Sequence, residues 1–254
     1  MRGYQTYCFD LDGTVYHGTE PVHEAVTLIE TLQNSGIEPY YMTNNSSATP
    51  EQVVEKLAGF GITTTSAYIM TSALAAGQYC KENHPGKTVQ MLGETGLSVA
   101  LEKEGIQQVT ENPDIVVMGI DRDVTYEKLA SVCLAIRAGA TFIATNGDKA
   151  IPTERGLLPG SGSFVKLVEY STGVAPIFMG KPEPFMLNAI REKSGAAKED
   201  MVLLGDNYDT DILTGIRYGI ATVHIDGGVT SHEEVLQKAQ QPTYLLRNLA
   251  EWLK

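Results

Sequence analysis

Segments of strand length alternate with helical segments at both ends of this chain, and this alternation restricts the fold more than any other feature. Residues 4–9 (YQTYCF) and 37–45 (IEPYYMTNN) predict strands. Apolar residues at helical spacing, with a proline near the start and a glycine at the end, predict helices over 21–36 and 49–61. Such alternation indicates right-handed strand–helix–strand units. The fold class we expect is therefore α/β, with a doubly wound, Rossmann-like parallel sheet.

The C-terminal third of the chain repeats this alternation. The predicted order is strand 176–180, helix 182–195, strand 201–206, helix 210–219 and strand 220–225. An apolar stripe over 244–254 predicts a terminal helix that packs Trp252. We therefore expect the two ends of the chain to supply two halves of one sheet.

The middle of the chain contains strand and helix patterns of its own. It is flanked by 81–87 (KENHPGK) and 169–176 (EYSTGVAP), whose glycine, proline and polar residues are typical of linkers. We therefore expect residues 1–84 and 178–254 to form one core domain and residues 85–177 to form an inserted α/β domain. A single sheet that contains every strand is the alternative.

Polar side chains follow the predicted core strands at the points where those strands end. A parallel sheet gathers such ends along one edge, where ligands bind. Each residue also has an ordinary explanation as a turn residue, a cap, a surface lysine or an acidic helix start. Their recurrence at successive strand ends favours one shared site, and its candidate residues are Asp10, Asp12, Thr43, Asn44, Lys181, Asp206 and Asp211.

The pair Asp10 and Asp12 poses an electrostatic problem. Side chains in a strand alternate faces, so these two carboxyl groups project to the same side wherever the extended conformation persists. Like charges at that spacing destabilise each other. Either a cation lies between them, or one carboxyl group holds a proton, or the chain turns and separates them.

Four segments resemble the four motifs of the haloacid dehalogenase superfamily. They are FDLDGT at 9–14, the threonine of YMTNN at position 43, the lysine of GKPEP at position 181 and GDNYDTDI at 205–212. The large insertion, with FIATNGD at 142–148 and LLPGSGSF at 157–164, resembles the cap of the NagD-like, 4-nitrophenylphosphatase-type branch. The resemblance extends over essentially the whole chain and implies a catalytic core with an inserted cap domain.

The resemblance implies a role for each candidate residue. Asp10 is expected to attack phosphorus and form an aspartyl-phosphate, while Asp12 protonates the leaving alcohol and then activates water. Lys181 is expected to neutralise Asp10 and keep it ionised, and Thr43 and Asn44 to bind phosphoryl oxygens. Expected ligands of Mg²⁺ are the side chains of Asp10 and Asp206 and the backbone carbonyl of Asp12, with support from Asp211. From the cap, Asn146 and Asp148 are expected to face the substrate.

Composition excludes several classes of partner. A formal net charge of −12 without a basic run disfavours nucleic acid. No apolar stretch approaches the roughly 20 residues that cross a bilayer, and the first residues enter a strand directly, so we expect a cytoplasmic protein with no membrane partner. Cys8, Cys80 and Cys133 lie far apart among apolar residues and are predicted to be small buried side chains.

The predicted function is Mg²⁺-dependent hydrolysis of small phosphorylated metabolites, either sugar phosphates or nucleoside monophosphates. Two alternatives remain open, namely a phosphotransferase or mutase on the same fold and a non-enzymatic phospho-aspartate signalling switch. The large insertion and the second aspartate of the first motif, Asp12, are unlike such a switch. A homodimer is an expected assembly.

Overall fold

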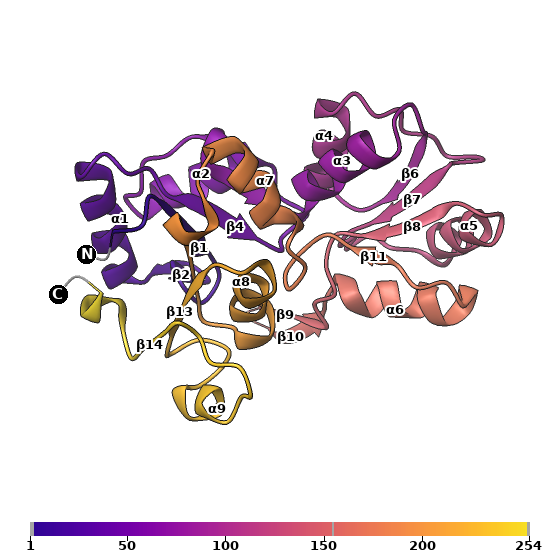
Figure 1. Ribbon diagram of the computed structural model, residues 1–254. Coiled ribbons are helices and arrows are strands. Elements are labelled where there is room, and N and C mark those ends of the chain that lie inside the picture. Colours follow the sequence, from indigo (N-terminus) through magenta and orange to yellow (C-terminus); the bar gives the residue numbers. More distant parts are fainter. Residues whose placement is uncertain (1–2, 154, 253–254) are drawn as a thin grey trace. The chain divides into compact units, whose positions relative to one another are not determined.

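Strand β1 (Thr6–Asp10) lies near the middle of a sheet in the computed structural model, which describes residues 3–153 and 155–252 (Figure 1). It pairs in parallel with β4 (Tyr40–Thr43) on one side and with β12 (Met201–Gly205) on the other. Beyond β12 the sheet continues in parallel through β13 (Ala221–Ile225) to β14 (Tyr244–Leu246), and β5 (Ile69–Thr71) follows β4. The two ends of the chain therefore build one sheet.

Helices connect these strands as the alternation predicts. Every residue of β1, β4 and β12 is buried, which is typical of parallel strands covered on both faces. The α/β prediction is confirmed. The connecting helices are α1 (His23–Asn34), α2 (Pro50–Gly59), α7 (Phe185–Ser194), α8 (Leu213–Tyr218) and α9 (His232–Leu236).

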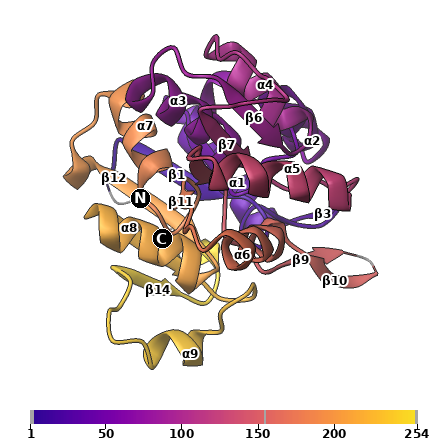
Figure 2. The ribbon, with the colours of Figure 1, turned by 90° about the vertical axis from the view of Figure 1, so that its right-hand side faces the viewer.

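A second parallel sheet has the strand order β11-β8-β7-β6. Its strands are β6 (Val89–Leu92), β7 (Ile115–Met118), β8 (Thr141–Ala144) and β11 (Ile177–Phe178). Apolar residues of α5 (Tyr126–Arg137) and α6 (Ser161–Thr172) pack against it in one buried cluster. An antiparallel hairpin of β9 (Ala150–Thr153) and β10 (Gly156–Pro159) projects beside α6 (Figure 2).

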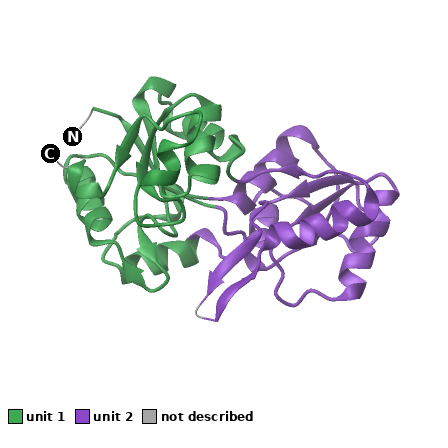
Figure 3. Cartoon of the chain, turned by 90° about the horizontal axis from the view of Figure 1, so that it is seen from below, with its two compact units in different colours: residues 1–43, 51–70, 181–254 green, residues 44–50, 71–180 purple. Residues whose placement is uncertain are grey.

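The chain divides into two compact units with bounds that differ from the predicted ones (Figure 3). Unit 1 contains residues 1–43, 51–70 and 181–254, and unit 2 contains residues 44–50 and 71–180. The predicted boundaries after residues 84 and 177 are displaced by two elements. That unit 1 is the catalytic core and unit 2 the cap stays a prediction.

Helix α3 (Ser72–Asn83) and strand β11 account for the displacement. Gly77 of α3 faces the carbonyl oxygen of Ala100 in α4 (Thr95–Lys103), and a Cβ at Gly77 would lie 2.8 Å from that oxygen. The missing side chain lets the two helices pack closely. Strand β11 pairs with β8 and so extends the sheet of unit 2, whereas the sequence pattern assigned it to the core.

The predicted terminal helix over 244–254 is also wrong within the residues that the structure describes. Residues 244–246 form β14 and complete an edge of the main sheet, and a single 3₁₀ turn, η4 (Leu249–Glu251), follows. Trp252 is buried, as expected, but it packs against Tyr4 and Tyr244. The three cysteines are free and buried, which confirms that prediction. Of the described helices, none is both long and apolar enough to cross a membrane.

Candidate active site

The register of the main sheet brings the first and last predicted motifs to one edge. Phe9 lies opposite Leu204 in the parallel pair of β1 and β12, so Asp206 follows β12 just beyond the level of Asp10. On the other side of β1, Asp10 lies opposite Met42, and Thr43 is the next residue. Three segments that are distant in sequence therefore end side by side.

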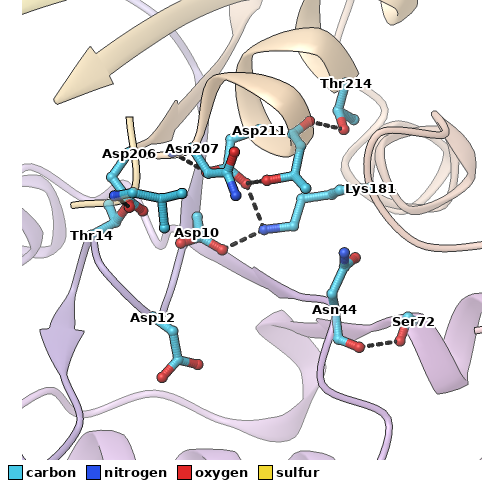
Figure 4. Close-up of polar contacts among 12 residues, drawn as sticks. Asp10, Asp12, Thr14, Asn44, Ser72, Lys181, Asp206, Asn207, Asp211 and Thr214 are labelled. Carbon is cyan, nitrogen blue, oxygen red and sulfur yellow. Dashed lines mark hydrogen bonds and ion pairs between the residues drawn. The ribbon is translucent and has the colours of Figure 1, made fainter. Parts of the chain in front are cut away.

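A buried cluster of charged side chains occupies this edge. One carboxylate oxygen each from Asp10, Asp206 and Asp211 lies within 4.8 Å of the other two. Lys181 is only 4% exposed, and its ammonium group donates hydrogen bonds to Asp10 and, at 2.7 Å, to Oδ1 of Asp211 (Figure 4). Three acidic groups and one basic group thus meet in a region shielded from water.

The carboxylate of Asp206 is held by donors from two loops. The Thr14 hydroxyl donates to Oδ1 at 3.0 Å, and the Val229 backbone N–H donates to Oδ2 at 2.7 Å. Glycines make room for it, because a Cβ at Gly228 would lie 1.9 Å from Oδ2 and a Cβ at Gly13 would lie 2.4 Å from the same atom. Neither position can carry a side chain without displacing the carboxylate.

Asp211 reaches the cluster from a π-helical turn, η3 (Tyr208–Ile212), that begins three residues after the end of β12. The Asn207 backbone N–H donates to Oδ2 of Asp211 at 3.0 Å, while Oδ1 accepts from Lys181. The Asn207 side chain accepts a hydrogen bond from the Asp209 N–H at 3.0 Å and so caps the turn. Both carboxylate oxygens of Asp211 are engaged, which suits a supporting position beside an ion.

Burial and the charge of Lys181 act on the pKa of Asp10 in opposite directions. That Lys181 keeps Asp10 ionised stays a prediction. Burial and the negative charge of Asp211 raise the pKa of Asp10 well above its ordinary value, Lys181 opposes the shift, and Asp206 adds to it. Burial and Asp211 likewise raise the pKa of Asp206. For Lys181, burial alone would lower the pKa, but Asp10 and Asp211 raise it, so its ammonium group stays charged.

This donor set fits a divalent cation of the Mg²⁺ type. Its ligand atoms are hard carboxylate oxygens that lie within 4.8 Å of one another, and three acidic groups exceed the single ammonium group in charge. A cation would also favour the ionised carboxylates that burial disfavours. The residues present are therefore suitable for Mg²⁺.

Asp12 lies outside the acidic cluster formed by the described residues. Figure 4 shows its carboxylate turned away from Asp10. Strand β1 ends at Asp10, and Gly13 follows at a φ of 98°, so the chain turns and separates the two carboxyl groups. The Tyr16 hydroxyl donates to Oδ2 of Asp12 at 3.2 Å, and burial together with the charge of Asp12 raises the pKa of Tyr16. The expected use of the Asp12 backbone carbonyl as a ligand stays a prediction.

The remaining predicted residues form a network within unit 2. The Asn146 side-chain amide and the Ser72 hydroxyl each donate to the Asn44 carbonyl oxygen at 2.7 Å, and the Asn44 side-chain amide donates to Oδ1 of Asp148 at 3.1 Å. The structure thus links three residues that the sequence analysis assigned to substrate binding from two separate segments. Their contact with substrate stays a prediction.

Sequence reasoning missed several supporting residues. Thr14 lies inside the first motif, but its hydrogen bond to Asp206 depends on the pairing of β1 with β12. Gly228 carried a signal, because it belongs to a pair of glycines just after a predicted strand, where backbone approaches a neighbour closely. Nothing in the local pattern indicates that Val229 contributes its backbone N–H or that Ser72 contributes its hydroxyl.

Comparison with known proteins supports the motif assignment. A family model described as haloacid dehalogenase-like hydrolase matches residues 7–107, and a second, described as HAD-hydrolase-like, matches residues 178–252. The 5'-nucleotidase YutF of Bacillus subtilis is 44% identical over 253 residues, which cover 100% of this chain and 99% of the relative. An acid sugar phosphatase of Staphylococcus aureus is 47% identical over 252 residues, with 99% and 97% covered.

Solved structures give the same result for the fold. A thermostable NPPase double mutant from Geobacillus stearothermophilus superposes with a TM-score of 0.93 at 44% identity and covers 99% of both chains. A 4-nitrophenylphosphatase from Thermotoga maritima superposes with a TM-score of 0.93 at 31% identity and covers 98% of this chain and 96% of its own. The similarity therefore includes both units.

Proposed function

This chain belongs to the haloacid dehalogenase-like hydrolase family and is a phosphatase, and we propose that it hydrolyses small phosphomonoesters with Mg²⁺ through an aspartyl-phosphate. The observation that carries the proposal is the convergence of Asp10, Lys181, Asp206 and Asp211 in one buried cluster. A nucleophilic carboxylate needs a neighbouring cation before it can approach an anionic phosphate, and this cluster offers an ammonium group and a set of ligands for a metal ion.

In the proposed enzyme, Asp10 and Asp206 hold Mg²⁺ with their side chains and Asp12 holds it with its backbone carbonyl, while Asp211 supports the ion. Bound there, Mg²⁺ neutralises charge on the phosphate and orients its oxygens. Thr43 and Asn44 bind phosphoryl oxygens by hydrogen bonds.

The reaction proceeds in two displacements. A carboxylate oxygen of Asp10 attacks phosphorus, the bond from phosphorus to the substrate oxygen breaks, and Asp12 gives its proton to that oxygen. Asp12 then takes a proton from water, whose oxygen attacks phosphorus and releases phosphate and Asp10. The separation of Asp12 from Asp10 supports these roles, because the attacking and leaving oxygens lie on opposite sides of phosphorus.

The substrate class follows from the named relatives. One is a 5'-nucleotidase and others are acid sugar phosphatases, so nucleoside monophosphates and sugar phosphates are the first compounds to test. We propose that Asn146 and Asp148 take part in recognising the leaving group, since they form a hydrogen-bonded network with Asn44.

The decisive experiment measures phosphate release from a panel of these compounds in Mg²⁺ and in a chelator. We expect turnover in Mg²⁺, little in chelator and none in Asp10→Asn. The matched control is Asp209→Asn, because Asp209 lies in the same acidic segment but its side chain is 72% exposed and pairs with Lys238. Wild-type activity in Asp10→Asn would refute the proposal.

Acid quenching during turnover tests the intermediate. Mass spectrometry should find one phosphoryl group on the peptide that contains Asp10 in the wild type and none in Asp10→Asn. Adding an acceptor alcohol separates hydrolysis from phosphoryl transfer, since a transferase or mutase would yield a phosphorylated acceptor in place of inorganic phosphate. A phosphoenzyme that persists without turnover would instead identify a signalling switch.

A further inference from the structure

We propose that Tyr16 is a positioning residue that holds the Asp12 carboxyl group in the orientation needed to protonate the leaving group. This inference rests on the proposed function, because it assumes that Asp12 is the general acid. It concerns a residue to which the mechanism above gives no role. The observation behind it is the hydrogen bond from the Tyr16 hydroxyl to Oδ2 of Asp12, at 3.2 Å.

The backbone after β1 brings Tyr16 next to Asp12. The carbonyl oxygen of Leu11 accepts hydrogen bonds from the N–H groups of Val15 and Tyr16 at 2.8 and 3.2 Å, which closes a tight loop. The Gly13 N–H donates in turn to the Tyr16 carbonyl oxygen at 2.8 Å, and Asp12 and Tyr16 form an isolated bridge. Residues four apart in sequence therefore become neighbours.

Packing fixes the Tyr16 ring far more firmly than the Asp12 side chain. Tyr16 is only 4% exposed, its ring centroid lies 5.2 Å from that of Phe60, and the Lys56 ammonium group lies 3.7 Å above the ring. Asp12 is exposed. An exposed carboxylate on a short side chain samples several rotamers, so a fixed hydroxyl donor is what selects one of them.

The selected orientation matches the chemistry of the first displacement. A general acid must lie on the side of phosphorus opposite the nucleophile, and the Asp12 carboxyl group is turned away from Asp10 in Figure 4. The hydrogen bond from Tyr16 engages Oδ2, so the other oxygen, Oδ1, is the one that we assign to proton exchange. Small misplacements of a catalytic group lower reaction rates substantially, so we expect the orientation of the Asp12 carboxyl group to affect the rate of the first displacement.

The test exploits the fact that leaving groups differ in their need for a proton. We would measure kcat/KM of Tyr16→Phe with 4-nitrophenyl phosphate and with an alkyl phosphate, because kcat/KM covers only the steps up to the aspartyl-phosphate. Nitrophenolate leaves without a proton, whereas an alkoxide does not. We expect a loss of about tenfold or more for the alkyl phosphate, part of the roughly 10²- to 10⁴-fold that general acids supply, and a change of less than about threefold for 4-nitrophenyl phosphate.

Tyr4→Phe is the matched control. It also deletes a hydroxyl that forms a hydrogen bond, here with the Tyr244 hydroxyl at 3.0 Å. Tyr4 precedes β1, whereas Asp10 of the acidic cluster lies at the other end of that strand. Both substrates should react with Tyr4→Phe as with the wild type. Three results for Tyr16→Phe would overturn the inference: equal losses of kcat/KM for the two substrates, no loss for either substrate, or failure of the variant to fold. Each of these results would mean that the Tyr16 hydroxyl has a merely structural role or no role.

Asp12→Asn, assayed in parallel, separates this inference from the proposed function. Full alkyl phosphatase activity in Asp12→Asn would refute the role of Asp12 as the acid, and with it the mechanism. A selective loss in Asp12→Asn that is absent from Tyr16→Phe would leave the mechanism intact and refute only the positioning by Tyr16.

Discussion

Lys181 shows at the scale of one residue how position determines the effect of a charge. Its side chain is 3% exposed and its ammonium group contacts Asp10 and Asp211, whereas the pair of Lys238 and Asp209 lies at the surface. When a buried ion pair loses one partner, the other charge stays buried without compensation. The free energy of unfolding then falls by about 3–5 kcal/mol. Exposed pairs contribute about 0–1 kcal/mol.

Replacing Lys181 by Gln should therefore lower both activity and stability. We expect kcat to fall by about 10²- to 10³-fold, as when one charge-stabilising donor is removed from an active site. The melting temperature in chelator should fall by several degrees, because Asp10 and Asp211 stay buried without their counter-ion. Calorimetry and steady-state assays provide the measurements, with Lys238→Gln as the control. A Lys181→Gln protein with normal turnover would contradict the proposed site.

The candidate residues that the sequence pattern identified differ from those that it missed in how they reach the site. Asp10 ends β1 and Asp206 follows β12, so their meeting at one edge follows from the parallel topology of the main sheet. Lys181 follows β11, which pairs with β8 in the other sheet, so its contact with Asp10 does not follow from that topology. The contact of Thr14 with Asp206 and that of Tyr16 with Asp12 depend on loop conformations. Such conformations are set by tertiary packing, which no local periodicity encodes.

At the scale of elements, the π-helical turn η3 determines where Asp211 points. Its wider turn lets a residue soon after β12 project back toward the strand end, and such turns are frequent at functional sites. The sequence predicted an ordinary helix over 210–219, and the structure has η3 followed by the shorter α8. Hydrogen bonds from Asn207 and Lys181 to Asp211 hold the irregular turn in place, and these form only after folding.

Asn207→Ala tests the coupling of this turn to catalysis. Loss of the side-chain cap should cost about 1 kcal/mol of stability, and a loosened Asp211 should lower activity. Asn248→Ala removes an equivalent cap, since the Asn248 side chain accepts from the Ala250 N–H at 2.9 Å in η4. We expect the melting temperature to fall by a similar amount in the two variants, and turnover to fall only in Asn207→Ala. Equal turnover in both would show that η3 is a purely structural turn.

Other elements show why domain boundaries escaped prediction. Strand β11 has only two residues, and its apolar sequence is compatible with either sheet. It pairs with β8, which is distant in sequence, and the local sequence pattern does not reveal such a pairing. Helix α3 belongs to unit 2 because Gly77 allows contact with α4, which is likewise invisible in a linear pattern.

For the whole molecule, we expect the acidic cluster to link stability to both Mg²⁺ and pH. The pKa values of Asp10 and Asp206 are raised in the folded protein, so without Mg²⁺ the folded state binds more protons than the unfolded chain. Its stability therefore falls as the pH rises from the ordinary carboxyl pKa through the raised values. A bound cation removes this loss by compensating the ionised carboxylates.

We accordingly expect Mg²⁺ to stabilise the wild type more at about pH 7.5 than at about pH 5, where protons compete for the same carboxyl groups. At a concentration 100 times the dissociation constant, the stabilisation should reach about 2.7 kcal/mol, which corresponds to several degrees in melting temperature. Differential scanning calorimetry measures the shift, and Asp206→Asn should abolish most of it. A shift that is independent of pH, or that persists in Asp206→Asn, would place the ion elsewhere.

The pairing of β1 with β12 also has a consequence for the newborn chain. Asp10 leaves the ribosome early, but β12 and Lys181 are translated only after all of unit 2. Until then the proposed nucleophile has neither the neighbouring strand β12 nor the counter-charge of Lys181. We therefore expect polypeptides that end before β12 to lack phosphatase activity.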